Sequence, residues 1–142
     1  MRLAATPGIS LLALVISCTG IENSLPDTSW TLTALGPISA PMPALKGHTA
    51  DLSLFEDDGR QVAGYTGCNS FWGNYEAERE SFTIAELFKH ERGCPTDKLF
   101  EQESAMIDIL TNAERYSSSG SQLTIESTNG RILVFERRDD RP

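Results

Sequence analysis

The chain has 142 residues and is acidic, with 20 Asp and Glu against 12 Lys and Arg and a formal net charge of −8. A surface of this charge repels phosphate backbones and anionic lipid headgroups, which argues against a nucleic-acid partner and against membrane binding through a basic patch. The length suits one domain with a single hydrophobic core.

The first residues have the pattern of a bacterial lipoprotein signal peptide. The apolar run Ile9–Cys18 is about ten residues long, half of what a membrane-spanning helix needs. It ends in Val15-Ile16-Ser17-Cys18, which matches the lipobox of an aliphatic residue, a tolerant position, a small residue and the acylated cysteine. We therefore expect Cys18 to be lipidated. The alternatives are an ordinary secretory peptide cut elsewhere, since Arg2 is the only basic side chain of the leader, or an internal core helix.

The lipobox divides the chain into four parts. Residues 1–17 are the expected signal peptide, residues 18–26 a polar tether, residues 27–138 the folded domain and residues 139–142 a polar tail. Acyl chains on one cysteine hold a protein at a bilayer, because each buried methylene contributes about 0.8 kcal/mol. Thr19 stands where Asp would retain a lipoprotein in the inner membrane of enteric bacteria. The expected location is therefore the periplasmic face of the bacterial outer membrane.

Local patterns predict short strands and turns over most of the domain. Alternating apolar residues indicate half-buried strands at residues 28–35, 50–55, 61–65 and 81–84. The proline-containing stretch 38–47 is expected to be a loop, and residues 64–69 a tight corner, because their glycines and Asn suit positive φ. The acidic residues Glu56, Asp57 and Asp58 lack the ligand spacing of a calcium loop and are expected to form a solvated turn.

One helix is predicted after Pro95, with Thr96 or Asp97 as its N-cap. Apolar residues at three-, four- and seven-residue spacings form one stripe that should face the sheet: Leu99, Phe100, Met106, Ile107 and Leu110. Five to seven short strands and one helix predict an α+β domain. We expect a small, strongly bent antiparallel sheet, a partial barrel, with the helix packed against it.

A hairpin is predicted at the end of the domain, and two registers are open to it. A two-residue loop, Asn129-Gly130, would place Ile125 opposite Val134 and mix core with solvent faces. A three-residue loop, Thr128-Asn129-Gly130, places Ile125 opposite Leu133 and Leu123 opposite Phe135. The second register buries a consistent face, so we expect it.

The cysteines predict one disulfide. Lipidation of Cys18 leaves Cys68 and Cys94, an even pair in an oxidising compartment. A bridge closing a loop of about 26 residues would stabilise the fold by roughly 3 to 4 kcal/mol. The alternative is a pair of thiols that do not meet or that stay reduced.

No catalytic, metal or cofactor site is predicted. Cys68 or Cys94 could serve as a nucleophile with His48 or His90 as base, but no known active-site spacing links them. A metal site built from both cysteines and a histidine would lack the short Cys-x-x-Cys or His-x-x-x-His pairing of such sites. A small thiol enzyme is therefore only a distant alternative.

One motif resembles a known family. The residues Gly64-x-x-Gly67-Cys68-Asn69-x-x-x-Gly73-x-Tyr75 look like the core of the META domain, the family of the bacterial HslJ heat-shock protein. The resemblance implies a small β-rich envelope domain with one helix, often lipid-anchored, and no established enzymatic activity. Family members are associated with heat shock and novobiocin resistance, and similarity to secretin-pilot lipoproteins suggests an interaction role. His90 and Gly93 depart from the family pattern, which argues against transferring particular ligand contacts.

The expected function is that of a non-enzymatic, outer-membrane-anchored lipoprotein. Such a protein would support envelope integrity or stress and antibiotic tolerance by binding a protein or an apolar ligand. The alternative is a pilot-like lipoprotein that escorts an outer-membrane assembly component. Four aromatic residues are a candidate binding surface, or else core and corner packing: Tyr65, Phe71, Trp72 and Tyr75. A buried apolar channel would indicate lipid or peptide binding, whereas a filled core with a flat aromatic patch would indicate protein contact.

Overall fold

The computed structural model describes residue 4 and residues 25–139, so Cys18 and its lipobox lie outside the described residues. Nine strands and one helix follow along the described chain: β1 (Thr28–Pro37), β2 (Met42–Pro43), β3 (Asp51–Glu56), β4 (Arg60–Tyr65), β5 (Ser70–Glu78), β6 (Ser81–Lys89), α1 (Asp97–Thr111), β7 (Ala113–Ser118), β8 (Gln122–Ser127) and β9 (Arg131–Arg137). Within residues 25–139, no helix is long and apolar enough to cross a membrane.

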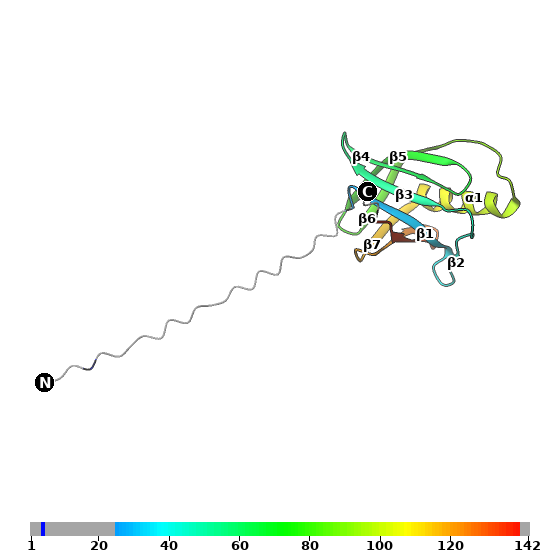
Figure 1. Ribbon diagram of the computed structural model, residues 1–142. Helices are drawn as coiled ribbons and strands as arrows, with labels where there is room; N and C mark the ends of the chain where they lie inside the picture. The colour runs from blue at the N-terminus through cyan, green and yellow to red at the C-terminus, as the bar shows by residue number, and fades with distance from the viewer. Residues whose placement is uncertain (1–3, 5–24, 140–142) are drawn as a thin grey trace.

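The antiparallel sheet closes into a barrel, so the prediction of a partial barrel was wrong (Figure 1). The long strand β1 pairs with β3 at its start and with β9 from Trp30 to Pro37, while the two-residue β2 pairs only with Ala34 and Leu35 of β1. A register shift between Leu32 and Ala34 in the β1–β9 ladder bends β1, between the residues that pair with β3 and those that pair with β2 on the other edge. Without β2, the other eight strands (β1 and β3 to β9) therefore form a closed ring that has no free edge strand. Between β6 and β7 the ladder is reduced to the pair Ser81–Arg115.

Five to seven strands were expected, and sequence patterns missed β5, β7, most of β6 and the two-residue β2, which lies in the predicted loop 38–47. In β5 the buried Phe71 and Tyr75 alternate with exposed neighbours, but a glycine occupies the inward position between them and hides the pattern. In β6 the register shifts by one residue, because Asn74 pairs with Glu86 while Tyr75 pairs with Ile84. The extra residue reverses which side chains face inward, so β6 has no single period of two.

The helix packs on β6, β8, β9 and β1, and its N-terminal end receives the long connection from β6 at the right of Figure 1. Of the two predicted N-caps, Thr96 is the one observed, and its side chain accepts from the Leu99 amide, while Asp97 is the first helical residue. The predicted stripe was wrong at Phe100, whose side chain is 59% exposed. The buried face of α1 is Leu99, Gln102, Glu103, Met106, Ile109 and Leu110.

Side chains occupy the barrel interior, the space that an elongated apolar channel would need. Its largest fully buried residues include Trp30, Phe71, Phe82 and Phe135. The closing hairpin adds to this core in the expected register, with Leu123 opposite Phe135 and Ile125 opposite Leu133. The predicted three-residue loop is therefore confirmed, with Gly130 at a φ of 74°.

We expect Gly73→Ala to lower the free energy of unfolding by about 2 kcal/mol, because a new side chain would overpack a close strand contact. A Cβ at Gly73 would lie 2.0 Å from the Glu86 carbonyl oxygen on β6. The matched control is Gly93→Ala, where nothing lies within 4 Å of the added Cβ. Urea denaturation of the two variants measures the difference, and equal losses would contradict the role given to Gly73.

Candidate functional site

The Gly-Cys-Asn corner between β4 and β5 holds a cluster of buried polar side chains. The Thr66 hydroxyl accepts from the amides of Cys68 (3.2 Å) and Asn69 (2.9 Å). The same hydroxyl donates to Glu103 Oε2 on α1 at 2.7 Å. From the neighbouring helix position, Gln102 Nε2 donates to the Thr66 carbonyl at 3.1 Å. The corner and the helix are thus joined by side-chain hydrogen bonds in a buried environment.

Glu103 is the buried charge of this cluster, with 3% of its side chain exposed. Its carboxylate accepts from Asn69 Nδ2 at 3.0 Å, in addition to the Thr66 hydroxyl. Lys89 at the end of β6 supplies the opposite charge, with its Nζ 3.4 Å from Glu103 Oε1. A buried carboxylate needs such donors, because an unpaired charge away from water is strongly disfavoured. The Glu103 carboxylate on α1 is therefore satisfied by donors from β6 and from the corner.

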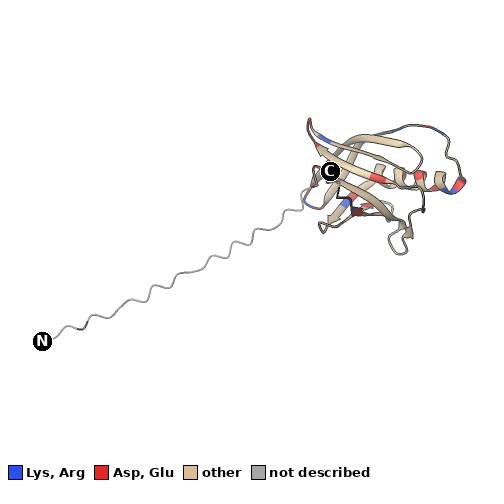
Figure 2. Cartoon of the chain, viewed as in Figure 1, with Lys and Arg blue, Asp and Glu red and all other residues tan. Residues whose placement is uncertain are grey.

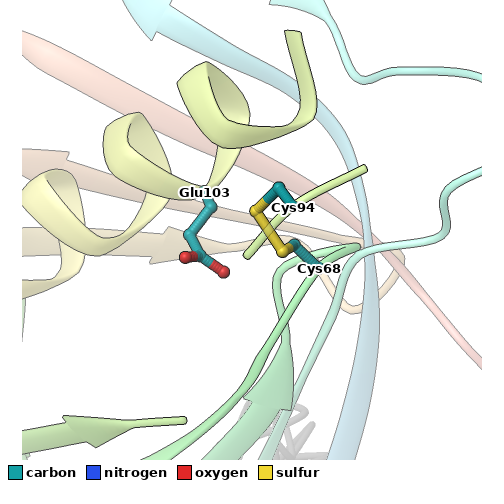
Figure 3. Close-up of side chains that lie close together, drawn as sticks. All are labelled: Cys68, Cys94 and Glu103. Atoms are coloured by element: carbon teal, nitrogen blue, oxygen red, sulfur yellow. A yellow bond between two sulfur atoms is a disulfide. The ribbon is translucent and has the colours of Figure 1, made fainter. Parts of the chain in front are cut away.

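Asn69 also ties the corner to the segment that leads into α1. Its Oδ1 accepts from the Arg92 amide at 3.0 Å, and its Nδ2 donates to the Arg92 carbonyl at 2.8 Å. The predicted bridge between Cys68 and Cys94 is present beside these bonds, with the two Cα atoms 5.5 Å apart. Figure 3 shows the disulfide lying next to the Glu103 carboxylate.

The motif glycine Gly67 makes this close packing possible. Its φ of 94° lies in the left-handed region, which side chains other than glycine rarely adopt. An added Cβ would also lie 3.1 Å from Leu99 Cδ1 and 3.2 Å from Gln102 Nε2 on the helix. The corner can therefore approach α1 only with glycine at this position.

The predicted aromatic surface is half right. Phe71 and Tyr75 are 1% and 2% exposed and belong to the core, whereas Tyr65 and Trp72 are 40% and 43% exposed. Sequence reasoning missed Phe88, which is 52% exposed and lies opposite Trp72 on β6. We call Tyr65, Trp72 and Phe88 the aromatic face.

The aromatic face lies on the outside of the sheet, beside small residues. The Trp72 and Phe88 rings stack with centroids 6.2 Å apart, and His90 contacts Trp72 edge-on at 5.0 Å. Across the strands, Trp72 is paired with Ala63, and Ala63 with Ser53. Because these neighbours are small, the aromatic rings project from the sheet surface around them. Such projecting rings suit contact with the flat surface of a partner protein.

Tyr75 has a buried hydroxyl that no other group satisfies. Among the described residues, this oxygen is the buried side-chain polar atom without a hydrogen-bond partner. Burial raises the pKa of the Tyr75 phenol above its ordinary value of 10.0, partly offset by the nearby Arg60 charge. Ionisation of this phenol therefore leaves stability unchanged well below pH 10 and lowers it as the pH rises from 10 through the folded-state pKa, because the unfolded chain releases the proton first.

We expect Tyr75→Phe to raise the free energy of unfolding at neutral pH by about 1 kcal/mol, because it removes an unsatisfied buried hydroxyl. It should also flatten the loss of stability above pH 10. Denaturation curves at neutral and alkaline pH test both effects. Tyr116→Phe is the control, since that phenol is only partly buried, and equal behaviour of the two variants would contradict the prediction.

The most central residue of the polar cluster, Glu103, was missed by the sequence analysis. Its signal was spacing, because Glu103 is four residues from Leu99 and three from Met106 and so shares their helix face. The other candidates remain apart from it. Glu56 ends β3 and pairs with Arg60 at 3.6 Å, while Asp57 and Asp58 form the expected exposed turn. Neither sulfur of the bridged cysteines is a free nucleophile in this structure.

A closed antiparallel barrel with one packed helix and a cysteine-bridged Gly-Cys-Asn corner defines a small class of β-rich domain. The sequence matches the family model of the META domain over residues 23–140, and the chain belongs to this family. No curated protein matches the chain.

Solved structures share the fold. A protein from Burkholderia xenovorans, determined by NMR, is 25% identical with a TM-score of 0.69, covering 81% of this chain and 84% of that one. A second NMR structure is 18% identical with a TM-score of 0.61, covering 79% and 90%. The crystal structure of a DUF4847 family protein from Bacteroides vulgatus is 14% identical with a TM-score of 0.58, covering 86% and 100%. The last two show likeness of fold alone.

Proposed function

We propose that this META-domain protein is a non-enzymatic lipoprotein of the bacterial outer membrane that binds a partner protein in the periplasm. The lipobox ending at Cys18 supports the anchor, and the disulfide suits an oxidising compartment. In Figure 2 basic residues are scattered among acidic ones, which supports a partner other than a polyanion. Such binding would support envelope integrity under stress or antibiotic challenge.

The aromatic face carries the proposal. Trp and Tyr concentrate binding energy at protein interfaces, and a stacked pair of exposed rings on a rigid sheet loses little side-chain entropy on contact. Trp72 and Phe88 stand on neighbouring strands of a closed barrel whose interior is filled. A partner protein is therefore favoured over an apolar ligand held inside the barrel.

Photo-crosslinking in living cells tests the partner. A photoreactive amino acid at Trp72 is expected to give one discrete protein adduct, and Phe88→Ser in the same chain should abolish it. The same probe at the exposed Glu114 on β7 is the control and should give no such adduct. Mass spectrometry of the adduct separates an outer-membrane assembly component, as for a pilot-like role, from other envelope proteins. Equal adducts from both positions, or lipid adducts alone, would contradict protein binding by the aromatic face.

The anchor is tested separately by metabolic labelling with palmitate. The wild-type chain is expected to incorporate the label and to fractionate with outer membranes, whereas Cys18→Ser should do neither. Palmitate label that persists in Cys18→Ser would contradict lipidation at Cys18.

A further inference from the structure

We propose that reduction of the Cys68–Cys94 disulfide converts the buried polar cluster into a Zn²⁺ site formed by both cysteine sulfurs and the Glu103 carboxylate. One ligand atom from each of these residues lies within 4.8 Å of the other two. Figure 3 shows the carboxylate and the two sulfurs side by side, from α1, the corner and the segment before the helix. This metal site is independent of the aromatic face and of the lipid anchor.

The reducing step needs an external dithiol. Its two sulfurs give up two electrons and two protons and become a disulfide, while the Sγ–Sγ bond between Cys68 and Cys94 breaks and both become thiols. Zn²⁺ then displaces up to two protons, because the thiolates are the metal-binding forms. The oxidised protein offers no thiolate and binds no Zn²⁺ at this place.

The surrounding hydrogen bonds keep the three ligands together after reduction. Asn69 holds the backbone of Arg92 by two hydrogen bonds that do not depend on the disulfide. Thr66 and Asn69 also fix the Glu103 carboxylate. Cys94 lies in a stretch without regular secondary structure, so its sulfur can move away from Cys68 without breaking a strand or helix.

The distances and ligand types suit Zn²⁺. Tetrahedral coordination with Zn–S of about 2.3 Å and Zn–O of about 2.1 Å places the ligand atoms about 3.6 to 3.8 Å apart. These separations are shorter than the 4.8 Å within which the two sulfurs and the carboxylate oxygen now lie. Two thiolates favour a soft divalent ion over Mg²⁺ or Ca²⁺, which prefer oxygen ligands. The ligand set carries three negative charges, and Lys89 lies 3.4 Å from Glu103, so the Zn²⁺ and this ammonium together neutralise them. The fourth position is left to water.

Titration of the full chain with Zn²⁺ against a chromophoric chelator, and with Co²⁺ as a spectroscopic probe, tests the site. Every protein carries Cys18→Ser, so that no third thiol contributes. The reduced protein should bind one Zn²⁺ about 100-fold more tightly than the oxidised protein or the Cys68→Ser/Cys94→Ser variant. Its Co²⁺ form should show thiolate-to-metal charge-transfer absorption. Glu103→Gln should weaken Zn²⁺ binding by about tenfold or more, as loss of a ligand requires.

Glu101→Gln is the matched control, because this carboxylate is exposed on the same helix. Reduced protein that binds Zn²⁺ no more tightly than the double serine variant would overturn the proposal, as would a Glu103→Gln variant equal to Glu101→Gln. Should Glu103→Gln not fold, Zn²⁺ must still raise the melting temperature of the reduced protein and leave that of the oxidised protein unchanged. Equal melting temperatures with and without Zn²⁺ in the reduced protein overturn the site on that measurement alone.

Discussion

Replacing the disulfide by Cys68→Ser/Cys94→Ser should lower the free energy of unfolding by about 3.5 kcal/mol, a large share of the stability of a small domain. The bridge links residues 26 apart in sequence and so removes many conformations from the unfolded chain. The folded state should change little, because Asn69 still holds Arg92 by two hydrogen bonds. Urea denaturation of the oxidised wild type and the double variant measures the loss.

The reduced wild-type protein is the control for the serine substitutions. Both proteins should carry Cys18→Ser, so that no mixed disulfide can form. Reduction and double substitution are expected to cost the same stability, since each removes the cross-link and leaves the hydrogen bonds in place. A loss below about 1 kcal/mol in either case would contradict the stabilisation expected from restricting the unfolded chain.

Local patterns predicted those parts of the fold whose interactions are close in sequence. Thr96 caps α1 through the Leu99 amide, and the Leu123–Phe135 register follows from a three-residue loop and an alternating face. Closure of the barrel could not be predicted in this way. It depends on β1 pairing with β9, and two segments a hundred residues apart leave no mark in local periodicity.

The sequence predicted only the part of the candidate site that follows from the number of cysteines. An even pair of cysteines indicated the bridge, but the direction of each aromatic side chain required the strands to be recognised first. Once β5 is a strand, alternation sends Phe71 inward and Trp72 outward. Phe88 faces out beside Trp72 only because β6 gains a residue at its register shift. An irregularity of one residue therefore decides what the aromatic face contains.

Glu103→Ala is expected to lower the free energy of unfolding by about 4 kcal/mol, the largest effect of a single substitution in the polar cluster. The carboxylate receives charge-assisted hydrogen bonds from Thr66 and Asn69, each contributing about 1.5 to 3 kcal/mol. Truncation leaves the buried Thr66 hydroxyl without this acceptor, and Asn69 Nδ2 keeps only its bonds outside Glu103, such as the one to the Arg92 carbonyl. Lys89 adds less, because it is 28% exposed and can turn to water when its partner is lost.

Three comparisons separate this cluster from a surface charge effect. Glu101→Ala, on the exposed side of the same helix, should change stability by less than about 0.5 kcal/mol. The cost of Glu103→Ala should persist in 1 M salt, where the Debye length is only about 3 Å, because buried pairs are screened far less than exposed ones. A double-mutant cycle with Asn69→Ala should show coupling of about 1 kcal/mol or more between the two side chains. Additive losses, or a cost that vanishes in salt, would mean that Glu103 acts through general electrostatics and not through the bonds that join α1 to the corner.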